Sequence, residues 1–164
     1  MYSIVSYDKN WPIMFSEESQ RIAEIIGDNI LEVQHIGSTS VPGMSGKPTI
    51  DILFVVDDIS KIKNNIADMR KIGYESLGAQ NAENSHLFEK EIEGKRIFIV
   101  HFYQKNHPEI KQIIAIRDYL KTHKNKALEY SNLKVSLFQK FPDSYSQYRK
   151  FKDEYMENLK NELV

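Results

Sequence analysis

The chain has 164 residues, 41% of them hydrophobic, and its 22 basic and 23 acidic side chains give a net charge of −1. This length and apolar fraction suit one folded domain. The balanced charge argues against a nucleic acid or an anionic membrane as a partner. The sequence has no cysteine, which excludes disulfides and thiolate metal sites. It shows no apolar run of membrane-spanning length and no signal-peptide pattern, so a cytoplasmic protein is expected.

The first part of the chain alternates strand and helix patterns. Three strands are expected here, at residues 3–6, 31–36 and 50–56. Pro12 suits the first turn of a helix that ends near Gly27. Residues 39–49 contain two Pro, two Gly and two Ser and predict a loop. Asp58 or Ser60 can cap a further helix, which would end at Gly73.

The second part begins with β patterns and ends in helices. Three more strands are expected, at residues 74–77, 86–92 and 96–103, the last two as a hairpin. Three helices follow, at residues 110–123, at residues 125–141 and after Ser144. Residues 1–105 thus predict a mixed sheet with helices, and residues 106–164 a helical segment packed on it. Together they predict one α/β domain over residues 1–164.

The segment from Gly37 to Asp51 carries the strongest chemical signal. Gly37 and Ser38 follow a strand, and such a turn offers backbone N–H groups and a hydroxyl to a phosphate chain. Asp51 opens the next strand, where its carboxylate can hold a divalent cation beside the phosphates. An aspartate in the apolar run 50–56 is costly unless a partner satisfies it, which favours a site role. Thr39 and Lys47 lie between these residues and are further candidates for contact with phosphate.

Three histidines are candidates for the same site. His101 alternates with Ile97 and Ile99 on an expected strand, and His35 directly precedes the Gly-Ser turn. With His86 and Asp51 they would form a transition-metal site, because imidazole suits Zn²⁺ or Mn²⁺ better than Mg²⁺. The alternative for each is a hydrogen-bonded histidine in the core. The register of the strands decides between the two interpretations.

Several segments together form a family pattern. They are "YDKNWPIMF" near the start, "HIGSTSVPGMSGKPTIDIL" in the centre, "RDYLKTH" from Arg117 to His123, and "ALEYSNLK" and "FPDSYSQYRKFKDEYM" in the last part. These segments resemble the GrpB family, a member of the nucleotidyltransferase-like superfamily. The resemblance implies a nucleotidyltransferase-like fold with appended C-terminal helices. Related domains occur fused to dephospho-coenzyme A kinase, which suggests nucleotide or coenzyme metabolism. The match to the family motif strengthens Lys47 as a phosphate contact. Arg117 can contact the ligand or pair with Asp118 between helix and sheet.

The chain departs from the superfamily pattern at Leu53. The pattern implied by the resemblance has a second acid two residues after Asp51, where nucleotidyl transfer uses carboxylates to hold metal ions. Asp57 shares the strand face but lies about 20 Å along the strand, too far to replace it. The superfamily often takes its third acid from a neighbouring strand, which makes His101 the candidate replacement.

Three functions follow as hypotheses. The first is an enzyme that transfers a nucleotidyl or phosphoryl group to a small molecule, with a divalent metal (Mg²⁺ or Mn²⁺, or Zn²⁺) at Asp51 and His101. The second is a binding module that keeps the nucleotide or phosphate pocket without catalysis. The third is a metal-dependent hydrolase built on the histidines. In each, the partner is a small phosphorylated ligand, and the sequence does not indicate an oligomeric state.

Overall fold

A five-stranded mixed sheet forms the centre of the molecule. The structure is a computed structural model and describes residues 1–80 and 82–163. The strands are β1 (Ile30–Ile36), β2 (Ile50–Val56), β3 (Tyr74–Gly78), β4 (Ser85–Ile92) and β5 (Lys95–Gln104), arranged in the order β1-β2-β5-β4-β3. β2 and β5 are parallel, and the other neighbours are antiparallel. The predicted mixed α/β fold is therefore confirmed.

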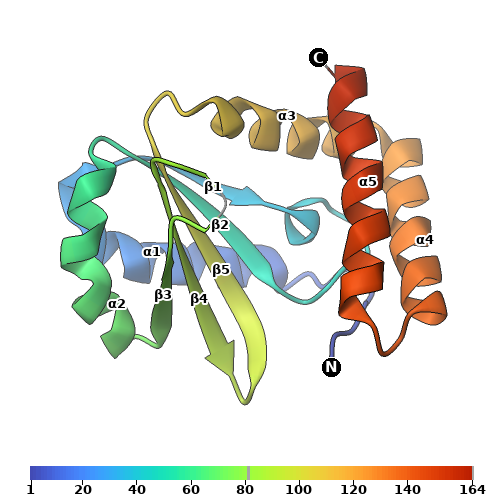
Figure 1. Ribbon diagram of the computed structural model, residues 1–164, viewed down its shortest axis with the longest axis horizontal. Coiled ribbons are helices and arrows are strands. Elements are labelled where there is room, and N and C mark those ends of the chain that lie inside the picture. Colours follow the sequence, from blue (N-terminus) through green and yellow to red (C-terminus); the bar gives the residue numbers. More distant parts are fainter. Residues whose placement is uncertain (81, 164) are drawn as a thin grey trace.

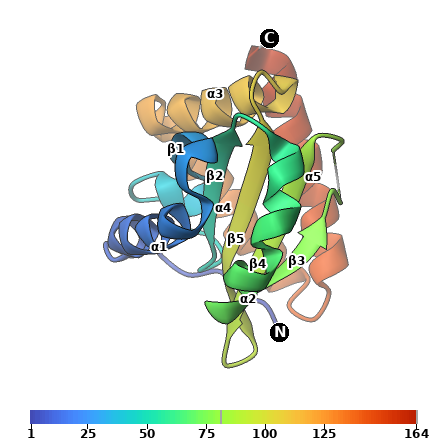
Figure 2. The same ribbon diagram turned by 90° about the vertical axis from the view of Figure 1, so that its left-hand side faces the viewer.

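One face of the sheet is covered by the first two helices. α1 (Trp11–Ile26) and α2 (Ile66–Lys71) lie on this side, with a 3₁₀ helix, Ile59–Asn65, leading into α2 (Figures 1 and 2). The main core lies between these helices and the sheet. It includes Phe54 and Phe102, whose stacked rings have centroids 5.1 Å apart. Alternation along β2 and β5 explains this core, because every second side chain of both strands is apolar and points to this face.

The other face is covered at one end by the C-terminal helices. They are α3 (Pro108–Thr122), α4 (Lys124–Lys140) and α5 (Tyr145–Leu163). Figure 1 shows α3 across one end of the sheet and α4 beside α5 at its flank. α3 packs on the sheet through Ile110, and α3, α4 and α5 pack together on the loop before β2. The part of that face around Asp51 and His101 stays partly exposed and is called the open face below. None of the helices in the described residues is long and apolar enough to cross a membrane.

Two predicted elements differ from the structure. At residues 3–6 only Val5 pairs, with Gly46, through hydrogen bonds of 2.9 and 3.0 Å. The facing segment contains Pro48, which lacks an N–H and stops the pairing from extending. The helix expected after Asp58 begins as the 3₁₀ helix and becomes α-helical only after Asn65, a residue of low helix propensity. Asp58 caps it as predicted, since its side chain accepts from the N–H of Ser60.

Candidate functional site

Gly37 and Asp51 lie at the centre of the candidate site. β1 runs antiparallel to β2 and places Ile36 opposite Asp51, so the turn after β1 lies beside the carboxylate. Gly37 has a φ of +74°, in the left-handed region that favours glycine. A Cβ atom at this position would lie 2.7 Å from Oδ2 of Asp51. Glycine is therefore required both for the backbone angle and for the close approach of the carboxylate.

His101 lies beside Asp51 on the open face of the sheet. The parallel register pairs Leu53 with His101, and alternation along β2 places Asp51 on the same face as both. Nε2 of His101 is 3.2 Å from Oδ1 of Asp51. The two side chains are 26% and 28% exposed. The structure thus brings this predicted pair together within hydrogen-bond distance, where solvent can reach it.

Leu53, in place of the second acid, is fully buried. It packs with Ile36, Val55 and Tyr103 beneath Ile110 of α3. A carboxylate at this position would lose its hydration inside an apolar cluster, at a large cost in free energy. β2 therefore carries one carboxylate on this face, Asp51, and buried Leu53 fills the position of the second. Glu89 of β4 lies on the same face, one strand further from Asp51, and pairs with Arg96.

His35 does not join this site. It pairs with Ile52, so alternation places its ring on the opposite face, where it stacks on Phe15 of α1 with ring centroids 4.7 Å apart. Its Nε2 lies 2.9 Å from Oγ1 of Thr39, whose side chain is also buried. Burial lowers the pKa of His35 to about 4, so the ring is neutral at physiological pH. His35 and Thr39 therefore support the turn from beneath.

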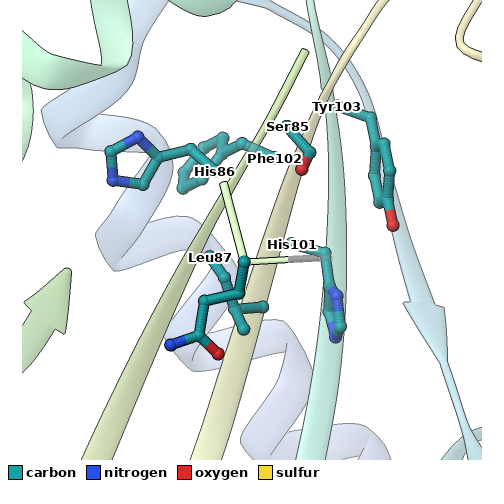
Figure 3. Close-up of a pocket in the computed structure, with 7 residues that line it drawn as sticks. Ser85, His86, Leu87, His101, Phe102 and Tyr103 are labelled. Atoms are coloured by element: carbon teal, nitrogen blue, oxygen red, sulfur yellow. The ribbon is translucent and has the colours of Figure 1, made fainter. Parts of the chain in front are cut away.

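His86 also lies on the covered face, so the expected cluster of three histidines does not form. It pairs with Phe102, and its Nε2 is 2.7 Å from Oγ of Ser76. Figure 3 shows the rings of His86 and His101 on opposite sides of their two neighbouring strands. Across residues 1–80 and 82–163, no group of three or more His, Asp or Glu side chains is placed to hold a metal. The hydrolase hypothesis required such a group.

Arg117 of α3 holds the end of β1. Its guanidinium donates to Oε1 of Gln34 at 2.6 Å and to the carbonyl of His35 at 3.0 Å. It also lies 2.9 Å from Oδ1 of Asp118, and only 11% of its side chain is exposed. Its donors are thus occupied by protein groups directly before the Gly-Ser turn. This position indicates a positioning role rather than the predicted contact with phosphate.

A lysine that sequence patterns did not single out contacts the turn. Nζ of Lys134 donates to Oγ of Ser38 at 2.8 Å, and Lys134 is 1% exposed. Burial, and secondly the charge of Lys152, lower the pKa of Lys134 to about 7. Its partners are this hydroxyl and the ring of Tyr130, whose centre is 4.4 Å away, and no ion pair with a carboxylate is found among the described residues. A signal existed in the sequence, because Lys134 shares a helix face with the buried Tyr130 and Leu137.

Lys47 faces a cavity next to the turn. Its Nζ donates to the hydroxyl of Tyr145 at 2.6 Å and lies 4.4 Å from the centre of that ring. The cavity has a volume of about 320 Å³ and is also lined by Thr49 and Arg96. Nη2 of Arg96 lies 2.5 Å from Oε2 of Glu89. Lys47 thus lies in the loop before Asp51 with its ammonium group directed at Tyr145, and its contact with phosphate stays a prediction.

The polar segment 78–85 lies at the other end of the open face, and residue 81 is outside the described residues. Oγ of Ser85 donates to the carbonyl of Ala82 at 2.5 Å, and Nε2 of His107 is 3.0 Å from the carbonyl of Glu83. A pocket of about 20 Å³ lies between this segment and His101 (Figure 3), with room for about one water molecule. The pocket is too small for a substrate.

Known proteins are similar to this chain in sequence and in fold. The family model described as GrpB protein matches residues 2–162. UPF0157 protein YqkA of Bacillus subtilis (strain 168) is 37% identical over 153 residues, 93% of this chain but only 44% of YqkA, so the chain spans less than half of that relative. The crystal structure of conserved protein GrpB from Enterococcus faecalis superposes with a TM-score of 0.93 at 36% identity, over 98% of this chain and 96% of that one.

A more distant likeness shows the fold alone. A structure of Cid1, described by its RNA terminal uridylyl transferase activity, superposes with a TM-score of 0.52 at 13% identity. It covers 80% of this chain and 40% of Cid1. This chain therefore shares the overall fold of Cid1, in agreement with the predicted nucleotidyltransferase-like fold. By family model, sequence and structure, the chain belongs to the GrpB family.

Proposed function

We propose that this protein binds the phosphate chain of a nucleotide, or of another phosphorylated small molecule, at the Gly37–Ser38 turn and transfers a nucleotidyl or phosphoryl group from it. The observation that carries the proposal is the contact between the turn and Asp51, where a Cβ at Gly37 would meet the carboxylate at 2.7 Å. A phosphate on this turn would lie directly beside the carboxylate. The likeness of the fold to that of Cid1 supports the same assignment.

Different residues around the turn would each contribute one contact or charge to a bound phosphate chain. Ser38 offers a hydroxyl, and the backbone N–H groups of the turn are further donors. Lys134 of α4 supplies a positive charge beside Ser38, and burial strengthens its attraction to an anion. Arg117 fixes the end of β1 and so keeps the turn in place.

The donors present fit a divalent cation that arrives with the ligand. Asp51 and His101 offer a carboxylate oxygen and an imidazole nitrogen 3.2 Å apart. Mg²⁺ and Mn²⁺ are commonly held by one or two side chains plus the substrate's phosphate oxygens, and an imidazole also suits Zn²⁺. When bound, such an ion would neutralise charge on the reacting phosphate. Asp51 would hold it and His101 would complete the pair.

A binding module without catalysis is the second candidate, and Leu53 is the observation that favours it. This side chain is fully buried beneath α3, so the position of the second carboxylate has become part of the core. A module of this kind needs only the turn, Ser38 and Lys134 to hold phosphate. It predicts tight binding of a nucleotide without conversion.

Calorimetry with Asp51→Asn and a matched control tests the proposal. ATP, GTP, CTP and UTP are titrated with Mg²⁺, Mn²⁺ or Zn²⁺, and release of pyrophosphate or phosphate is followed in parallel. The control is Asp57→Asn, because Asp57 lies just beyond the other end of β2 and pairs with Lys105 at 2.5 Å. Binding that depends on metal, and that Asp51→Asn alone abolishes, supports the transferase. Metal-independent binding that Asp51→Asn leaves intact and that Ser38→Ala weakens identifies the binding module. Absence of binding by all four nucleotides and by inorganic pyrophosphate would contradict both.

A further inference from the structure

A second cavity lies beside the candidate site, and none of the proposed roles uses it. It has a volume of about 320 Å³, within the range of small-molecule sites. Its walls come from the first residues of the chain, the loop before β2, the β4–β5 hairpin and the start of α5. In Figure 1 the hairpin and the lower end of α5 flank this region. Tyr145, the first residue of α5, and Ile97 of β5 both line the cavity.

The charges on the walls favour an anion. Three cationic side chains line the cavity, against one acid, Glu91; they are Lys47, Lys95 and Arg96. Nη2 of Arg96 lies 2.5 Å from Oε2 of Glu89, while 44% of the Arg96 side chain is exposed and can reach a ligand. A guanidinium suits a planar or tetrahedral oxyanion. Because Arg96 is paired with Glu89, Lys47 and Lys95 against Glu91 leave a surplus of about one positive charge, which favours an anionic group such as a phosphate monoester.

The remaining walls favour a flat or apolar body attached to that group. The ring of Tyr145 forms one wall, and Pro48 and Ile97 supply apolar surface. Nζ of Lys47 lies 4.4 Å from the centre of the tyrosine ring, so the cation and the aromatic face are presented together. A ligand with a phosphate on a small flat skeleton contacts both.

The cavity adjoins Asp51 along the sheet. Thr49, in its wall, lies two residues before Asp51 and bonds through its hydroxyl to the carbonyl of Arg96 at 2.9 Å. Ile97 lies two residues before Ile99, which pairs with Asp51. Two residues of extended chain span about 7 Å, which is the distance along the sheet between this wall of the cavity and Asp51.

We infer that this cavity is a second ligand site, for a small phosphate monoester with a flat or apolar body. If the proposed function holds, on which this step rests, the cavity's ligand is the acceptor of the transferred group. A hydroxyl oxygen of the acceptor forms a bond to the phosphorus of the transferred group, and the bond from that phosphorus to the leaving phosphate oxygen breaks. The leaving group departs as pyrophosphate or as a nucleoside diphosphate, and the hydroxyl proton passes to water.

Nuclear magnetic resonance of the ¹⁵N-labelled protein tests this inference with phenyl phosphate as the probe. We expect shifts of amide signals in the cavity walls, at residues 47, 49, 95–97 and 145. Phenol tests the need for charge and inorganic phosphate the need for the ring; both are expected to bind more weakly. Lys47→Gln should weaken phenyl phosphate binding at least about tenfold, the effect of losing a charged hydrogen bond. The exposed Lys63→Gln is the matched control.

The outcomes separate this site from the nucleotide site. ATP with Mg²⁺ in the same sample is expected to shift signals at residues 37, 38 and 134 instead. Phenyl phosphate that binds the cavity while ATP, GTP, CTP, UTP and inorganic pyrophosphate all fail to bind supports the cavity and overturns the proposed function. Phenyl phosphate that shifts only the signals near Ser38, or no signals at all, overturns the inference. Binding that Lys47→Gln and Tyr145→Leu both leave unchanged overturns it as well.

Discussion

Lys134→Met tests whether the buried amine beside Ser38 binds the phosphate of a ligand. Methionine keeps the length of the side chain and removes the charge. Lys134 is 1% exposed, and burial lowers its pKa from 10.5 to about 7. At about 1.4 kcal/mol per pKa unit, the charged form is disfavoured in the ligand-free fold by roughly 5 kcal/mol. The amine is therefore about half neutral at pH 7 in the folded chain and fully protonated in the unfolded chain.

The pH dependence of stability follows from this difference. Between about pH 7 and pH 10 the unfolded chain holds a proton that the folded chain has released, so the free energy of unfolding rises with pH. From pH 7 to pH 9 this rise amounts to about 2 kcal/mol for Lys134. Urea denaturation measures it in the wild type, and Lys134→Met should lack it. Lys140→Met, which changes an exposed lysine of the same helix, should retain it.

Ligand binding provides the second half of this test. A phosphate beside Nζ favours the charged amine, so saturating ATP and Mg²⁺ should remove the pH dependence that Lys134 causes. Binding at pH 8 should then take up a proton, which calorimetry in buffers of different ionisation enthalpy detects. Lys134→Met should bind ATP at least about tenfold more weakly, the effect of losing a charged contact. Equal pH slopes in the wild type and Lys134→Met, without ligand, would refute the reasoning.

Three further predictions concern residues around the site and in the core. Gly37→Ala should destabilise the fold by about 1–3 kcal/mol, because of its positive φ and its contact with Asp51, and should abolish nucleotide binding; thermal denaturation and calorimetry measure the two effects. Glu18→Gln should lower the free energy of unfolding in urea by about 2–4 kcal/mol, since the amine of Lys90, 2.8 Å from the carboxylate, loses its charged partner. Nucleotide affinity should not change, because this pair lies on the covered face. Arg117→Met should speed hydrogen exchange at the end of β1 and weaken nucleotide binding, and unchanged exchange would show that Arg117 does not position the turn.

The sequence predicted most of the fold because its patterns are local. Alternating or continuous apolar runs indicated all five strands of the sheet, and helical spacing indicated α1, α3, α4 and α5. Two predicted elements were wrong, in segments whose local pattern does not decide the structure. The run before Asn65 has apolar residues at helical spacing, yet it folds as a 3₁₀ helix. Val5 lies in a β-like run but finds only one pairing partner.

The candidate site was harder to predict because strand register decides it. Asp51 pairs with Ile99 in the parallel register of β2 and β5, and His101 lies two residues further along β5 on the same face. The two side chains therefore meet. His35 and His86 have the same chemistry, but a shift of one residue along a strand places them on the other face. The contact of Lys134 with Ser38 joins residues 96 positions apart, and only the packing of α4 on the loop before β2 brings them together.

The charges of the site indicate how its ligand binds. A free divalent cation meets one carboxylate, Asp51, and one imidazole, His101, and the amine beneath the turn repels it when protonated. A bare phosphate chain meets the turn, the hydroxyl of Ser38 and the amine, but it also lies against the carboxylate of Asp51. A nucleotide that carries its own cation satisfies both halves, since the cation neutralises Asp51 and the phosphates neutralise Lys134. With Leu53 in place of a second acid, the metal and the nucleotide should therefore bind as one complex, and titration of Mg²⁺ or Mn²⁺ alone should show much weaker binding than titration of the complex.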